Sequence, residues 1–167
     1  MYYRFPLTQI YRADYKNKAW HFKRPDERDL HAASEWLAAS VHGSEAWRRR
    51  MYKRLLQEFS TTEELVQPRS WMVTVSANRV CFFDVEEGFL HEAQIHLTAP
   101  PNLLRDNRAA LILWRRVTKY LLSLKNWRRL YIQLDVSRAA EGRALEKLGF
   151  QKEGDDHVLD LIPDRSV

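Results

Sequence analysis

The chain has 167 residues, of which 45% are hydrophobic, 12% aromatic and 29% charged. This composition is enough for one domain with its own core, and it excludes a disordered or low-complexity protein. The formal net charge is +5, which suits an anionic partner such as a nucleotide-like cofactor, or serves solubility alone. The longest apolar run, residues 109–114, is far too short to cross a membrane, so no membrane partner is expected.

The single cysteine, Cys81, cannot form an internal disulfide, and it leaves no cysteine-based metal site. The first residues mix charged and aromatic side chains and contain no secretory hydrophobic region. A reducing, cytoplasmic location is therefore expected. We expect residues 1–18 to form an aromatic and basic arm, and residues 19–167 to form the folded domain.

The first half of the domain is predicted to contain one strand, two helices and an antiparallel meander. Residues 19–24 alternate like a strand, and Pro25 with the acidic residues after it predicts a helix that continues to about Val41. A second helix is expected from Glu45, with an apolar stripe and an arginine-rich remainder. Three strand-like stretches follow, at 70–77, 79–85 and 89–98. The connectors between them are short enough for hairpins.

The second half is predicted to alternate helices and strands. Two prolines in residues 99–107 predict a loop, because proline cannot extend a central strand. We then expect a helix at about 108–125, a strand at 129–136, a helix at about 138–148 and two short strands near 150–153 and 157–162. This order predicts an α/β (α+β) protein with a mixed, mostly antiparallel sheet and helices on both of its faces.

The most specific motif lies near the end of the chain. The segment ALEKLGFQKEG, residues 144–154, follows the strand RLYIQLDV and places a short amphipathic helix directly before Gly-Phe and another strand. Together with the element order, it resembles the GCN5-related N-acetyltransferase (GNAT) fold over about residues 20–162. The likeness is stronger to degenerate members from bacteriophage genomes, which share a histidine-containing fourth strand, an arginine-led loop without glycines and the GF-x-x-EG ending.

The resemblance implies that acetyl-CoA or another acyl-CoA binds in a gap between splayed fourth and fifth strands. The acyl group would pass to an amine of a protein or a small molecule. Members of the family hold the cofactor's pyrophosphate on backbone N–H groups at the start of the long helix, where the helix dipole also attracts anions. The cofactor-binding residues implied are Ile95, Leu97, Arg105, Asn107, Arg108, Ala109 and Ala110. Either Arg105 or Arg108 leads the motif, and in the first register Arg108 occupies the position of its central glycine.

A second departure from the family lies in the last helix, where Leu145 occupies the position of the tyrosine that often protonates the leaving thiolate. Alternation puts Glu92, Gln94 and His96 on one face of the fourth strand. The resemblance makes Glu92 or His96 the candidate base, and Tyr131 on the fifth strand the nearest substitute acid. The alternative is that these polar side chains only hydrogen-bond one another and the neighbouring strand.

Three functions stay open at this point. The first is an acyl-CoA-dependent N-acyltransferase. The second is a catalytically inactive protein with the same fold, serving as a phage virion component or as a host-directed binding protein, and located in the host cytoplasm or the virion. The third is a nucleic-acid binder, which the net charge of +5 permits, although the basic residues form no recognisable motif.

Overall fold

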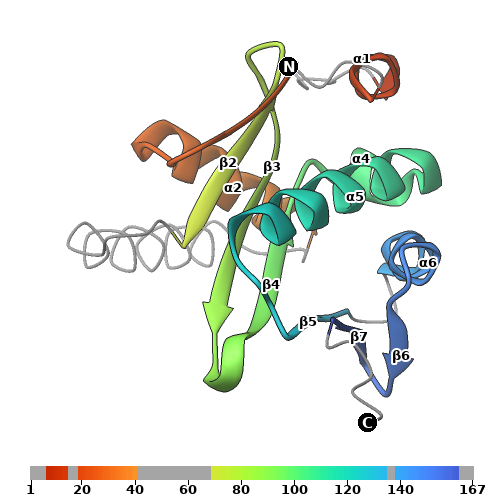
Figure 1. The fold of residues 1–167 in the computed structure, drawn as a ribbon. Coiled ribbons are helices and arrows are strands. Elements are labelled where there is room, and N and C mark those ends of the chain that lie inside the picture. Colours follow the sequence, from red (N-terminus) through yellow and green to blue (C-terminus); the bar gives the residue numbers. More distant parts are fainter. Residues whose placement is uncertain (1–6, 15–18, 41–68, 135–137, 162–167) are drawn as a thin grey trace, which may run out of the picture. The chain divides into compact units, whose positions relative to one another are not determined.

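The computed structural model describes residues 7–14, 19–40, 69–134 and 138–161. Its strands are β1 (Trp20–Lys23), β2 (Ser70–Val75), β3 (Asn78–Glu87), β4 (Glu92–Thr98), β5 (Arg129–Gln133), β6 (Gln151–Glu153) and β7 (Asp156–Asp160). Its helices are α1 (Leu7–Ala13), α2 (Glu27–Ser40), α4 (Pro101–Arg105), α5 (Asn107–Leu124) and α6 (Ala139–Lys147), and a 3-10 turn, η2, spans Phe89–His91 (Figure 1). The helix expected from Glu45 lies outside the described residues.

The seven strands form a mixed sheet in the order β1-β2-β3-β4-β5-β7-β6. The β1–β2, β2–β3, β5–β7 and β6–β7 pairs are antiparallel, whereas β4 and β5 are parallel. The α/β fold class expected from the sequence, with a mixed and mostly antiparallel sheet, is therefore confirmed. The chain divides into two compact units, residues 1–84 with 97–101 and residues 85–96 with 102–167.

The region expected to be a loop, residues 99–107, was predicted incorrectly, because it contains the short helix α4. Pro101 is the first residue of this helix. Proline excludes a central strand, but it is well suited to the first helical position, where its fixed φ fits and no N–H is needed. The strand expected from Phe89 begins at Glu92 instead, because Leu90 and His91 adopt positive φ angles of 59° and 61° in the turn before it.

The first unit packs α2 against its strands. Leu30 and Ala33 of α2 are buried with Met72 of β2 and Phe82 of β3, and Trp36 packs against this cluster. These residues recur on one face of the helix, as the periodicity of the sequence predicts. The first unit also contains α1, which is joined to the start of β1 because the indole of Trp20 donates a hydrogen bond of 2.8 Å to the Ala13 carbonyl.

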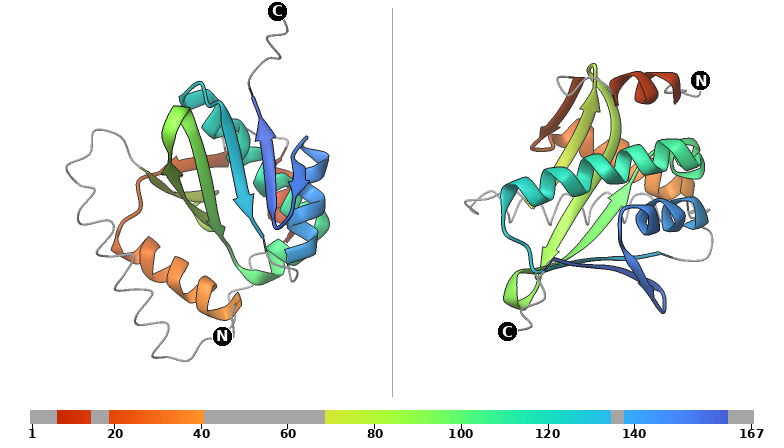
Figure 2. Two further views of the ribbon diagram at one scale, coloured as in Figure 1. Left: turned by 90° about the horizontal axis from the view of Figure 1, so that it is seen from below. Right: turned by 45° about the vertical axis from the view of Figure 1, so that its right-hand side comes forward.

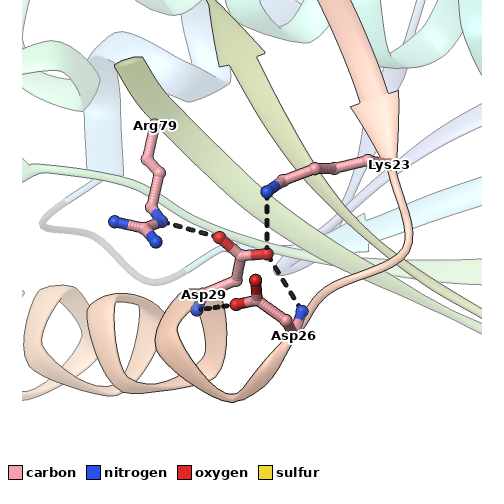
Figure 3. A network of polar contacts seen from close by, with 4 residues as sticks. All are labelled: Lys23, Asp26, Asp29 and Arg79. Carbon is pink, nitrogen blue, oxygen red and sulfur yellow. Dashed lines mark hydrogen bonds and ion pairs between the residues drawn. The ribbon is translucent and has the colours of Figure 1, made fainter. Parts of the chain in front are cut away.

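A buried carboxylate holds the start of α2 (Figure 3). The Asp29 backbone donates to Asp26 Oδ1 at 2.9 Å, and the Asp26 backbone donates to Asp29 Oδ2 at 3.0 Å, which is the reciprocal arrangement of a capping box. The Asp29 side chain is fully buried and also contacts Arg79 Nε at 2.6 Å and Lys23 Nζ at 3.2 Å. Burial by itself raises the pKa of Asp29, but hydrogen bonds from Arg79, Asp26 and Lys23 outweigh it and lower the pKa overall.

In the second unit, α5 and α6 pack against each other, and α6 also contacts β6 and β7, beside which it lies in Figure 2. The helix α6 ends in a Schellman motif. Gly149 has a φ of +100°, its N–H donates to the Glu146 carbonyl at 3.1 Å, and the Phe150 N–H donates to the Leu145 carbonyl at 3.0 Å. Phe150 is buried directly after this turn. The Gly-Phe of the sequence motif thus ends the helix and anchors the strand that follows.

Candidate functional site

The strands β4 and β5 separate soon after they begin, as the right-hand view of Figure 2 shows. Their parallel register contains three pairs, Glu92 with Arg129, Ala93 with Leu130 and Gln94 with Tyr131. Beyond this point β5 continues in register with β7, whereas β4 from Ile95 onward has no register partner in β5. The parallel and splayed arrangement expected for these two strands is therefore present.

One face of these two strands is polar and the other is apolar. Ala93 and Ile95 of β4 are buried, as are Leu130 and Ile132 of β5. The opposite face carries Glu92, Gln94 and Tyr131, which are half-buried, and His96, which is exposed. The predicted alternation is confirmed. Because paired residues of neighbouring strands point to the same side, Gln94 and Tyr131 lie together on the polar face at the last pair before the strands separate.

His96 is placed two residues beyond that last pair. Its Nε2 atom lies 3.4 Å from Oε2 of Glu86, at the long end of hydrogen-bond distance. The side chains of His96 and Glu86 are 49% and 72% exposed, so both are accessible to solvent. Glu86 was not singled out in the sequence, since only the register of the hairpin brings it to His96. This contact also agrees with the alternative that the polar residues bond to the neighbouring strand.

Glu92 lies in the paired part of the two strands instead, next to Arg129. Arg129 Nε donates to Asp160 Oδ1 at 2.7 Å. This hydrogen bond, together with the charges of Asp160 and, more weakly, Glu92, raises the pKa of the Arg129 guanidinium. Glu92 therefore faces a cation in the closed part of the strand pair, whereas His96 lies where the pair has opened.

Leu145, at the position expected for an acid, is fully buried in α6. The same helix contains a buried carboxylate, Glu141, which accepts hydrogen bonds from Trp114 Nε1 at 3.0 Å and from Arg138 Nη2 at 2.7 Å. Arg138 directly precedes α6, and Trp114 belongs to α5. This polar cluster joins the two helices, so its carboxylate is engaged in structure.

The start of α5 carries most of the expected cofactor-binding residues. Arg105, the last residue of α4, and Asn107 and Arg108, the first residues of α5, are exposed, whereas Ala109 and Ala110 are buried, as are Ile95 and Leu97 on β4. The side chains of the two alanines are therefore closed to a ligand, and the Ala110 N–H donates to the Asp106 carbonyl at 2.9 Å within the helix. Asn107 Oδ1 accepts hydrogen bonds of 2.8 and 3.3 Å from Arg143 of α6, which adds a third guanidinium to this first turn.

The carboxylate of Asp106 already accepts a hydrogen bond from one of the backbone N–H groups at the start of α5. Asp106 is the N-cap of α5, with φ −84° and ψ 122°, and its Oδ1 atom accepts a hydrogen bond of 2.9 Å from the Ala109 N–H. Sequence reasoning missed this residue, although Asp directly before a helix is one of the preferred caps. It also missed Arg143, which no local signal connects to Asn107, 36 residues earlier.

Two further classes of site find no support in the part of the chain that the structure describes. No group of three His, Cys, Asp or Glu side chains there could hold a metal ion. Cys81 is buried, and burial raises the pKa of its thiol, which keeps it protonated and unreactive. None of the described helices combines the length and apolarity that a membrane span requires.

No protein-family model matches the sequence, and no sequence of a curated protein matches it either. Solved structures do match. The spermidine/spermine N-acetyltransferase SpeG from Vibrio cholerae, in mutant forms, has a TM-score of 0.67 at 15% identity, over 87% of this chain and 95% of that one. YncA from Salmonella typhimurium, a putative acetyltransferase with its cofactor acetyl-CoA, has a TM-score of 0.61 at 15% identity, over 89% and 97%.

RimJ from Mycobacterium smegmatis, in complex with CoA-disulfide, has a TM-score of 0.62 at 14% identity, over 84% of this chain and 81% of that one. These likenesses, together with the parallel strands that separate and the helix that follows, show that the chain has the fold of the GNAT acetyltransferases. The three proteins are bacterial, and the expected likeness to phage-encoded members stays a prediction.

Proposed function

We propose that this protein transfers an acyl group from an acyl-CoA to an amine. The observation that supports the proposal is the separation of β4 from β5 after Gln94 and Tyr131. Strands that part in this way leave backbone hydrogen-bonding groups of β4 facing the gap, and an extended ligand arm can pair with them as an added strand does. The separation lies within a fold that two of the similar structures share while holding acetyl-CoA or a CoA disulfide.

The residues present fit this cofactor at the gap and provide positive charge where its phosphates are expected. Ile95 would lie along the acyl-pantetheine arm, and Arg105 and Arg108 would attract the phosphates together with Arg143. Bound acyl-CoA would supply a thioester, whose acyl carbon accepts the amine nitrogen and whose sulfur leaves as a thiolate that needs a proton.

His96 is the residue that we assign as the base. A proton on Nε2, directed at Glu86, leaves Nδ1 as the lone-pair nitrogen that can take the proton of the amine. Tyr131, at the last strand pair, is the phenol that we assign as the proton donor, since Leu145 has no proton to give.

Titration calorimetry with acetyl-CoA tests this proposal without knowledge of the acceptor. We expect saturable binding, followed by amine-dependent release of CoA across a panel of amines that includes polyamines and peptide amino groups. A polyamine belongs in the panel because similar structures are named as spermidine N-acetyltransferases. Failure to bind acetyl-CoA, together with no turnover of any amine, would contradict the proposal.

Two observations favour a second function. The buried Leu145 gives no proton, and Asp106 covers part of the anion site, so a catalytically inactive protein with this fold is the alternative. Such a protein would bind a virion or host protein rather than a cofactor. The same calorimetry separates the two, because the inactive protein has no need to bind acetyl-CoA.

A further inference from the structure

The start of α5 presents a conflict between the cofactor expected there and a residue of the chain. Asp106 Oδ1 accepts a hydrogen bond from the Ala109 N–H at 2.9 Å, and this N–H is one of the four that a helix leaves without an intrahelical partner. The same four N–H groups, with the positive end of the helix dipole, form the anion site on which GNAT proteins place a pyrophosphate. Asp106 therefore accepts a hydrogen bond from an N–H group that the cofactor's diphosphate would also use.

We infer that Asp106 competes with the diphosphate of CoA for the start of α5 and sets the affinity of this protein for its cofactor. The inference rests on the proposed function. A carboxylate and a diphosphate are both anionic, so they repel each other and compete for the same N–H donor. The diphosphate must therefore displace the Asp106 side chain, or bind with that donor withheld.

Asp106 differs in the sign of its charge from the side chains around it at the start of α5. Arg105 and Arg108 are exposed next to it, and Arg143 is held at the same turn by Asn107. Each of these guanidinium groups favours a phosphate ligand, whereas the carboxylate of Asp106 opposes it. The conflict concerns the phosphates alone, because the gap beyond Gln94 and Tyr131 is where the pantetheine arm would lie. The affinity of the chain for a ligand without phosphates should not depend on the charge of Asp106.

The test removes the charge of Asp106 but keeps at this position a residue that caps α5. Asn is as good an N-cap as Asp, so Asp106→Asn removes the negative charge without unfolding the helix start, and Asp106→Ser repeats the change with a second strong cap. Glu153→Gln is the matched control, since it makes the same change in net charge at an exposed position of β6. Calorimetry measures the affinity of each chain for CoA and for pantetheine, which lacks phosphates, and thermal unfolding confirms that each variant is folded.

We expect Asp106→Asn and Asp106→Ser to bind CoA about 10-fold more tightly than the unchanged chain, with pantetheine affinity and the Glu153→Gln control unchanged. Equal or weaker CoA binding by both folded variants would overturn the inference. Tighter CoA binding without transfer to any amine would support the role of Asp106 and contradict the proposed function. Absence of CoA binding in all four chains would overturn both.

Discussion

Carboxylates cap the first turn of both α2 and α5, but the two caps differ in burial and in neighbours. Asp29 is fully buried, shares a reciprocal cap with Asp26 and contacts two cations, Arg79 and Lys23. Asp106 is half-buried and lies in an exposed turn that is rich in arginine. A buried, fully bonded carboxylate stabilises the fold, whereas a carboxylate at the open start of a helix can yield to a ligand.

The same contrast extends beyond the caps. In the first unit the buried Asp29 carboxylate is bonded to Arg79 and the other residues of its network. In the second unit His96 and Glu86 form a long, exposed contact on the part of β4 that has no partner in β5. We therefore expect changes in the first network to affect stability alone, and changes along β4 and the start of α5 to affect binding and turnover alone. Four experiments test whether stability and binding are separated in this way.

The largest effect is expected for His96→Ala. Loss of the general base should lower the rate of acyl transfer about 10²–10⁴-fold, while the melting temperature stays within a few degrees because the side chain is exposed. Steady-state assays with acetyl-CoA and thermal unfolding measure the two quantities. Glu92→Gln is the matched control on the same strand face, and it should be the milder change. A variant with unchanged turnover would remove His96 from the mechanism and return Glu92 as the candidate.

The next effect is expected for Asp29→Ala, which should lower the free energy of unfolding by about 2–4 kcal/mol. The loss combines one half of the capping box with two ion pairs. It stays below the full cost of breaking a buried pair because Arg79 and Lys23 are partly exposed and can return to water. Urea denaturation checks the value. Glu35→Ala, at an exposed position of α2, is the control, and a comparable loss there would contradict the special role of Asp29.

A smaller effect is expected for the arginines at the start of α5. Removing Arg108 or Arg105 should weaken CoA binding by about 1.5–3 kcal/mol, or roughly 10- to 150-fold, if that residue is a charged partner of the phosphates. Arg115→Ala, at an exposed position further along the helix, should have little effect. Silence of both Arg105→Ala and Arg108→Ala would show that the phosphates are held elsewhere.

The smallest effect is expected in the pH dependence of stability, to which a different residue contributes in each unit. Burial, with the charge of Lys152 assisting and those of Glu146 and Asp156 opposing, lowers the pKa of His157. Because the pKa of His157 is lower in the folded chain, the imidazole takes up its proton more readily in the unfolded chain. Its contribution to the free energy of unfolding is therefore fully present above about pH 6.5 and declines as the pH falls below that value. The lowered pKa of Asp29 acts at lower pH, because its contribution is present above the unfolded carboxyl pKa near 3.9 and is lost as the pH falls through the folded value.

Denaturation curves measured from pH 8 to pH 3 should therefore show two declines in stability. The decline in the upper window should be reduced in His157→Gln, and the decline in the lower window should be reduced in Asp29→Asn. Curves that respond to neither substitution would show that other groups govern the acid response of both units.

Local patterns predicted most of the fold, because they depend on neighbours in the sequence. The alternation of Glu92 and His96 with Ala93 and Ile95 follows from the period of a strand, and the Gly149-Phe150 ending follows from the need for positive φ after a helix. The helix α4 was not predicted, because a proline such as Pro101 excludes a central strand but is compatible with both a loop and the first turn of a helix.

The candidate site was less predictable, since its contacts join residues that are distant in the sequence. Glu86 meets His96 through hairpin register, and Arg143 reaches Asn107 from another helix. Asp106 is the exception, because its cap could have been predicted from the residues beside it. The assigned roles of the catalytic and cofactor-binding residues, and the division at residue 18, stay predictions.

Gly142 limits which sequences this fold can accept. A methyl group at this position would meet His157 Nε2 at 3.4 Å and Cε1 at 3.5 Å, while a glycine inside a helix costs about 1 kcal/mol relative to alanine. Alanine is therefore compatible with the contact, whereas a branched side chain would force α6 away from β7. Gly142→Ala should therefore be tolerated in this chain, whereas Gly142→Val should lower the melting temperature.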